Sequence, residues 1–151
     1  MGPAIDRVQA NPATSPAPPD VLLIFDGGSR GNPGQGYGSF ALIQVCKGSQ
    51  RIERLELGDH YTNNEAEYDT LSAALESLLA QLRKAGLDPA AVSLEVRGDS
   101  ALVIKQLQGQ WQAKEPRMRM RRDRCRQLLG QFGRVKLKTQ PRAESVRVLG
   151  H

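Results

Sequence analysis

Residues 62–67, which read Thr-Asn-Asn-Glu-Ala-Glu, mark the place where the chain changes from strands to helices. Thr62 is a favourable N-cap residue, and Glu65 follows it at the spacing of a capping box, in which each residue bonds the other's backbone N–H. Leucines then recur at helical spacing until Gly86 and Pro89 stop the pattern. The sequence therefore predicts one long amphipathic helix that begins at this point.

The segment before this helix carries the pattern of three strands. Residues 21–25 form an unbroken apolar run, which is typical of a strand covered on both faces. We expect a glycine-rich loop over residues 27–36, a second strand over residues 36–45 and a third over residues 52–57. A hairpin turn at residues 47–49 joins the last two, so these two strands are expected to be antiparallel.

The segment after the long helix alternates strands and helices. Strands are expected at residues 92–96 and 134–138, and helices at residues 100–107, at residues 116–129 and from about residue 143. Helical crossovers are right-handed and place the strands that they join in parallel. The whole pattern predicts an α/β fold with a five-stranded mixed sheet, three antiparallel strands followed by two parallel ones, and helices on both faces.

The composition of the 151 residues is that of one soluble globular domain. The sequence has no apolar run of about 18 residues that could span a membrane, and it lacks the pattern of a secretion signal. Cys46 and Cys125 are too few for a disulfide framework, so we expect them to be reduced in a cytoplasmic, monomeric protein. The net charge of +5 and the pI of about 9.6 favour a polyanionic partner.

Prolines and basic residues are unevenly distributed along the chain. Five prolines occur within the first 19 residues, a density that predicts a disordered tail over residues 1–19 and a folded domain over residues 20–151. Basic side chains crowd one stretch, residues 114–126, most of which belongs to the predicted helix at residues 116–129. A solvated helix face and a surface that contacts phosphates are both open interpretations of this cluster. Its members are Lys114, Arg117, Arg119, Arg121, Arg122, Arg124 and Arg126.

Three acidic residues are expected to converge at one edge of the sheet. Asp26 follows the first apolar run and Asp99 follows the fourth strand, so the two carboxylates meet if these strands are adjacent and parallel. Each aspartate alone is more typical of a turn or a helix cap. Glu67 lies four residues before Leu71 on the apolar stripe of the long helix, where a carboxylate is costly unless it is paired or bound to metal. The three residues therefore predict a site for Mg²⁺ or Mn²⁺.

The glycine-rich segment allows two other interpretations, both of which the sequence disfavours. A dinucleotide-binding loop of the Rossmann type opens a helix, whereas residues 40–45 have the pattern of a strand. A phosphate-binding P-loop requires Gly-Lys-Ser or Gly-Lys-Thr, and the sequence contains neither.

Three sequence motifs occur in a characteristic order. Residues 25–34 read Phe-Asp-Gly-Gly-Ser-Arg-Gly-Asn-Pro-Gly, residues 62–68 read Thr-Asn-Asn-Glu-Ala-Glu-Tyr, and residues 98–100 read Gly-Asp-Ser. Together they resemble the motifs of the ribonuclease H family, type HI, and the likeness covers roughly residues 21–145. The short stretch at residues 109–116 is similar to that of the subgroup without the basic handle insertion.

This resemblance implies an endonuclease that hydrolyses the RNA strand of an RNA–DNA hybrid. Asp26, Glu67 and Asp99 would be the catalytic metal ligands, with two divalent ions present during catalysis. RNA would be selected through its 2′-hydroxyl groups in the minor groove. For the asparagines, turn formation and helix capping remain the structural alternative. The residues that would contact the hybrid are Gly27, Gly28, Ser29, Arg30, Asn32, Asn63, Asn64 and Lys114.

The chain departs from the family pattern near its C-terminus. The family has a histidine after the fifth strand and a fourth aspartate in the last helix, and these positions correspond to Thr139 and Leu149. Glu144 lies about five residues too early, roughly 140° around the helix, so we expect it to face away. His151 is a candidate auxiliary residue. Two hypotheses follow, an active nuclease with three acidic ligands and a weakened or inactive module that only binds hybrid.

Overall fold

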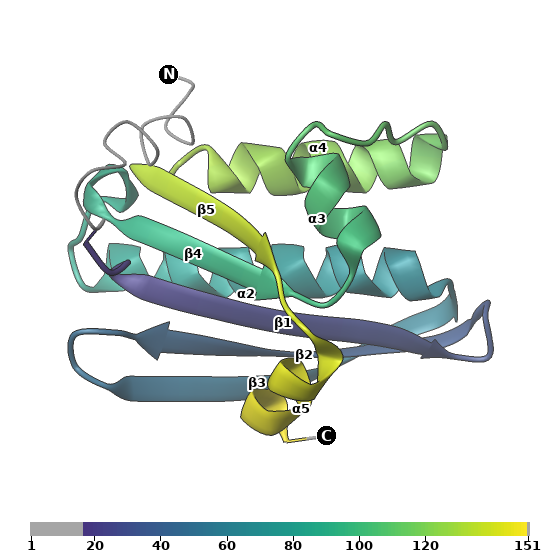
Figure 1. The fold of residues 1–151 in the computed structure, drawn as a ribbon, viewed down its shortest axis with the longest axis horizontal. Coiled ribbons are helices and arrows are strands. Elements are labelled where there is room, and N and C mark those ends of the chain that lie inside the picture. Colours follow the sequence, from purple (N-terminus) through teal and green to yellow (C-terminus); the bar gives the residue numbers. More distant parts are fainter. Residues whose placement is uncertain (1–16, 151) are drawn as a thin grey trace.

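The computed structural model describes residues 17–150, which form a sheet with helices packed on both of its faces (Figure 1). Most of the predicted tail, residues 1–16, and His151 lie outside the described residues. Among the helices in the described part of the chain, none is long and apolar enough to cross a membrane. The elements are β1 (Val21–Arg30), β2 (Gly34–Gln44), β3 (Ser49–Tyr61), α2 (Asn63–Lys84), η1 (Pro89–Ala91), β4 (Ser93–Gly98), α3 (Ala101–Leu107), α4 (Pro116–Leu129), β5 (Arg134–Thr139) and α5 (Arg142–Leu149).

The sheet has the strand order β3-β2-β1-β4-β5. β2 pairs antiparallel with β1 and β3, while β4 pairs parallel with β1 and β5. Buried residues of α2, α3 and α4 share one large core on one face of the sheet, and α5 packs against β1 and β2 on the opposite face (Figure 1). The predicted five-stranded mixed α/β fold with helices on both faces is therefore confirmed.

Side chains of β1 alternate between two cores. Leu23 and Phe25 belong to the large core beneath α2, whereas Ile24 packs with Ala41 and Leu149 on the side of α5. Successive side chains of a strand point to opposite faces, so Asp26 shares the face of Ile24. This alternation explains why the strand is apolar without interruption, because both of its faces are covered.

The prediction of a glycine-rich loop over residues 27–36 is wrong, because most of these residues belong to β1 and β2. β1 continues through Gly27 to Arg30 and pairs with β2, in which Gly27 lies opposite Gly38. A Cβ atom on Gly27 would lie only 2.7 Å from the carbonyl carbon of Ala66, because α2 crosses the strand at this point. Gly27 therefore allows the helix backbone to approach the strand closely. Glycine is also common in turns, so the sequence alone does not distinguish the two roles.

The start of α2 agrees with the capping box predicted from the sequence. The Glu65 N–H donates to Thr62 Oγ1 at 3.2 Å, and the Thr62 N–H donates to Glu65 Oε1 at 2.9 Å. The leucines of the predicted stripe are buried in the large core. Because the cap fixes where the helix begins, it also fixes which helical face Glu67 presents.

We expect the substitution Gly27→Ala to lower the free energy of unfolding by about 2 kcal/mol, because the new methyl group would overlap the backbone of α2. Urea denaturation followed by circular dichroism measures this loss. Gly130→Ala is the control, since Gly130 is exposed and has a right-handed helical backbone. Equal stability of Gly27→Ala and wild type would contradict the close crossing.

Candidate active site

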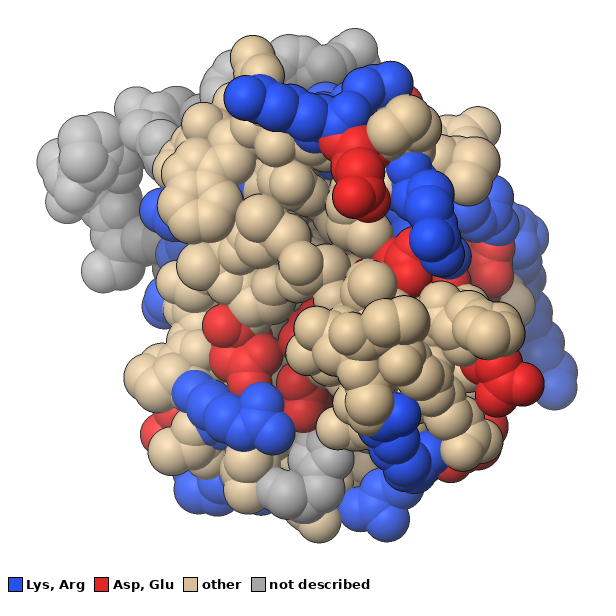
Figure 2. Space-filling view, turned by 90° about the vertical axis from the view of Figure 1, so that its right-hand side faces the viewer, with Lys and Arg blue, Asp and Glu red and all other residues tan. Residues whose placement is uncertain are grey.

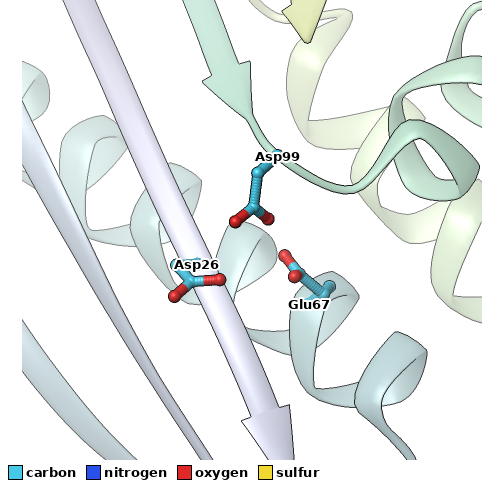
Figure 3. Close-up of side chains that lie close together, drawn as sticks. All are labelled: Asp26, Glu67 and Asp99. Carbon is cyan, nitrogen blue, oxygen red and sulfur yellow. The ribbon is translucent and has the colours of Figure 1, made fainter. Parts of the chain in front are cut away.

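Three carboxylates converge where β1 continues past the end of β4 (Figure 3). Asp26 and Asp99 each follow the last paired residues of these strands, Phe25 and Gly98. Glu67 reaches the same place from the first turns of α2. Each of the three offers a carboxylate oxygen, and these oxygens all lie within 4.8 Å of one another. The convergence is as expected, although Asp26 lies inside β1 and does not end it.

Burial gives this cluster its electrostatic character. Asp26 is 3% exposed and Glu67 is 6% exposed. Burial, followed by the charges of Asp26 and Asp99, raises the pKa of Glu67 to about 9, while a backbone hydrogen bond from Gly27 and the charge of Arg142 act in the opposite direction. Ionising all three carboxylates at once therefore costs free energy unless a cation lies nearby.

The donor set fits a divalent cation. Within residues 17–150, Glu67 Oε1 is buried and accepts no hydrogen bond, although a buried carboxylate oxygen normally requires a partner. Carboxylate oxygens are hard ligands of the kind that Mg²⁺ and Mn²⁺ prefer. An ion held by Asp26, Glu67 and Asp99 would satisfy this oxygen and offset the repulsion among the three groups.

Arg142 is a residue of this site that the sequence analysis missed. Its Nη1 atom lies 3.4 Å from Asp99 Oδ2, and the side chain is otherwise exposed at the start of α5. The guanidinium reaches Asp99 from a helix 43 residues further along the chain, so local spacing gives no sign of the contact. A single exposed arginine compensates only part of the charge of three carboxylates.

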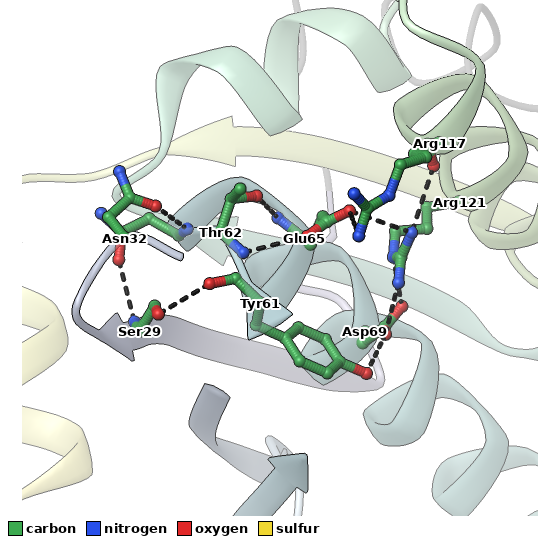
Figure 4. Close-up of polar contacts among 9 residues, drawn as sticks. Ser29, Asn32, Tyr61, Thr62, Glu65, Asp69, Arg117 and Arg121 are labelled. Carbon is green, nitrogen blue, oxygen red and sulfur yellow. Dashed lines mark hydrogen bonds and ion pairs between the residues drawn. The ribbon is translucent and has the colours of Figure 1, made fainter. Parts of the chain in front are cut away.

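The turn between β1 and β2 lies against the start of α2 (Figure 4). The Ser29 N–H donates to Asn63 Oδ1 at 2.9 Å, and the Asn63 N–H donates to Asn32 Oδ1 at 3.0 Å. The side-chain oxygens of Asn32 and Asn63 therefore have a structural role, which is the alternative to a contact with the hybrid. Asn32, Asn63 and Asn64 are nevertheless exposed, and the last two lie within four residues of Glu67 in the sequence.

The other predicted contact residues are less uniform. Gly27 is half-buried and Gly28 is buried, and a Cβ on Gly28 would meet the hydroxyl of Tyr37, so both glycines serve packing. Arg30 is exposed, pairs with Glu56 and lies over the ring of Tyr37. Lys114 is exposed in the connection between α3 and α4. His151 lies outside the described residues.

Known proteins are similar to this chain both in sequence and in fold. Residues 24–148 match the family model described as reverse transcriptase-like. Ribonuclease HI of Halobacterium salinarum is 41% identical over 132 residues, which cover 84% of this chain and 59% of that protein. The crystal structure of RNase H1 from the same archaeon superposes with a TM-score of 0.72 at 40% identity, over 84% of this chain and 89% of that one.

This chain belongs to the ribonuclease H family, type HI. The N-terminal RNase H domain of Rv2228c from Mycobacterium tuberculosis is similar, with a TM-score of 0.73 at 30% identity over 83% of this chain and 90% of that one. LC11-RNase H1, solved in complex with an RNA/DNA hybrid, has a TM-score of 0.74 at 29% identity over 84% and 89%. The chain spans about three fifths of the Halobacterium protein and a third of the bifunctional protein Rv2228c.

Leu149 and Thr139, the two positions at which we expect the chain to depart from the family pattern, have different surroundings. Leu149 is 1% exposed and packs with Ile24 and Ala41, on the sheet face that also carries Asp26. Thr139 is exposed at the end of β5. Glu144 is exposed and pairs with Arg147, and within residues 17–150 the acidic cluster contains three members. The position at which we expect the family's fourth aspartate therefore holds a leucine of the core.

The arginine-rich helix α4 matches neither of its two interpretations fully, because many of its arginines bond to this chain. Arg124 pairs with Glu76, Arg121 pairs with Asp69, and Arg126 donates to the carbonyl of Leu107 at 3.3 Å. Figure 2 shows a face on which Lys and Arg lie in separate groups with acidic side chains between them. A large part of the basic charge of α4 is thus used within the fold.

We expect metal-free protein to lose stability as the pH rises from about 5 to about 8. The pKa of Glu67 is higher in the folded state than its usual 4.5, so its stabilising contribution is complete below 4.5 and is lost as the pH rises toward about 9. The loss is at most about 1.4 kcal/mol per pH unit. Urea denaturation in a chelator measures it, and an equal pH slope in Glu67→Gln would contradict the assignment.

Proposed function

We propose that this chain is a metal-dependent endonuclease that hydrolyses the RNA strand of RNA–DNA hybrids. The observation that carries the proposal is the convergence of Asp26, Glu67 and Asp99 beside the exposed asparagines at the start of α2, in a chain of the ribonuclease HI family. The similar LC11-RNase H1 was solved in complex with an RNA/DNA hybrid, which supports the same substrate here.

In this proposal the residues divide the work between binding and chemistry. Asp26, Glu67 and Asp99 would hold Mg²⁺ or Mn²⁺, and the family resemblance implies two ions during catalysis. When bound, the ions supply the charge stabilisation and the activated water that phosphodiester hydrolysis needs. Asn32, Asn63 and Asn64 would contact the hybrid through their exposed amide NH₂ groups, which can donate to the backbone and the 2′-hydroxyl groups while the oxygens of Asn32 and Asn63 accept within the chain.

Leu149 motivates the second candidate function, a module that binds hybrid without cutting it. The buried leucine offers no oxygen to a cation, so the more weakly held ion has fewer ligands than it has in the family pattern. Three carboxylates still provide a strong site for one ion, and the hydrolase therefore remains the preferred proposal. Salt-dependent binding of hybrid without strand scission would identify the binding module.

Cellular location and oligomeric state remain predictions of the same proposal. Cys46 is exposed, Cys125 is buried, and both are free thiols. An exposed free thiol suits the reducing cytoplasm that the sequence favours. We propose a monomer, which light scattering of the purified chain measures directly.

We expect the purified chain to cut the RNA strand of a labelled hybrid in Mg²⁺ or Mn²⁺ and not in a chelator. Asp26→Asn should reduce cutting by at least about a hundredfold, because it weakens a direct metal ligand. Glu144→Gln is the matched control, since it removes an acidic charge outside the cluster and should leave the rate unchanged. A hybrid that stays intact with both metals would reject the hydrolase.

A further inference from the structure

We propose that Arg117 is a positioning residue, which holds the hybrid-contacting end of α2 in place through the buried carboxylate of Glu65. The inference deepens the proposed function and rests on it. Arg117 belongs to the basic cluster of α4, so its exposed charge first suggests a direct contact with DNA phosphates. Its geometry indicates a contact within the chain (Figure 4).

Glu65 has two roles in the structure. Its Oε1 atom accepts the Thr62 N–H at 2.9 Å and so completes the capping box of α2. Its Oε2 atom lies 2.6 Å from Arg117 Nη2 and 3.6 Å from Arg121 Nη1. The same carboxylate thus joins the first turn of α2 to one face of α4, on which Arg117 and Arg121 are neighbours four residues apart.

The buried position of Glu65 makes these cations necessary. The side chain is 2% exposed, and a carboxylate buried to this extent is costly unless it is both paired and hydrogen-bonded. Arg121 is shared with Asp69, which also accepts the hydroxyl of Tyr61 at 2.7 Å. Arg117, which is 61% exposed, directs its guanidinium to Glu65 and makes the shorter of the two contacts.

Loss of Arg117 should affect substrate binding more than the chemical step. Asn63 and Asn64 lie between Thr62 and Glu65, the two residues of the cap, so the cap helps to hold both of them, together with the hydrogen bonds of Asn63 to Ser29 and Asn32. Glu67 lies beyond it, and the contact of its backbone and that of Ala66 with Gly27 holds this part of the helix independently. Weakening the cap should therefore disturb the hybrid contacts while leaving the carboxylate cluster assembled.

The test compares Arg117→Gln in the wild-type and Glu65→Gln backgrounds, using steady-state cleavage of labelled hybrid in Mg²⁺. In the wild-type background we expect KM to rise roughly tenfold and kcat to change less than about twofold, a size typical of losing a helix cap. Arg117→Lys keeps the charge and should recover most of the affinity. Arg124→Gln removes the same charge from an exposed pair with Glu76 and should leave KM unchanged.

The Glu65→Gln background separates a positioning role from a direct phosphate contact. Glutamine still completes a capping box and leaves no buried charge for Arg117 to compensate. If Arg117 positions α2, Arg117→Gln has little further effect on KM in this background. An undiminished rise in KM there, or no rise in the wild-type background, would overturn the inference.

Amide hydrogen exchange tests the same contact without any cleavage. In Arg117→Gln the N–H groups of Thr62 and Glu65 should exchange roughly tenfold faster than in wild type, whereas those of Arg124→Gln should not change. Unchanged exchange in Arg117→Gln would overturn the positioning role. If wild type fails to cut hybrid while this exchange difference is present, the proposed function is wrong, but the positioning of α2 by the contact between Arg117 and Glu65 is retained.

Discussion

The close crossing of α2 over Gly27 is the constraint on which the acidic cluster depends. No side chain separates the strand from the backbone of Ala66, so the helix lies near enough for Glu67 to reach the end of β4 beside Asp26 and Asp99. A larger residue in the strand would lift the helix and separate the carboxylates. The glycine-rich part of β1 is therefore a packing element of the site, independent of any contact with substrate.

Two buried glutamates of α2 have opposite electrostatic surroundings. Glu65 and Glu67 are two residues apart and both buried, yet they point to different surroundings. Glu65 receives two arginines from α4 and a backbone N–H, so the protein itself supplies its compensation. Glu67 faces two aspartates, which raise its pKa further after burial has raised it. Only the second environment lacks a neighbouring cation of sufficient charge, and it is the one suited to a divalent ion.

The fold and the three carboxylates were predictable because they depend on local patterns. The capping box set the first turn of α2, and helical spacing then separated Glu67 on the apolar stripe from Glu65 at the cap. The continuation of β1 past Asp26 was not predictable in this way. The segment after Asp26 is rich in glycine, as loops are, and the residue against which Gly27 packs lies on a later helix. The partners of α4 were hidden for the same reason, because the contact of Arg121 with Asp69 spans 52 residues. Long-range pairing decides whether a basic helix faces solvent or its own chain.

The proposed correspondence of Leu149 with the family's fourth carboxylate sets core packing against metal binding. A leucine fully buried against Ile24 and Ala41 contributes roughly 1.5–3 kcal/mol to stability, whereas an aspartate there would add a fourth negative charge beside Asp26. The metal-free fold therefore carries less repulsion than a cluster of four acids would. The same correspondence would leave one oxygen ligand fewer, so each cation would depend more heavily on the three carboxylates. Under this correspondence, core packing on the face of α5 comes at the expense of one oxygen ligand, and Glu67 would affect both the stability of the metal-free fold and the binding of the cation.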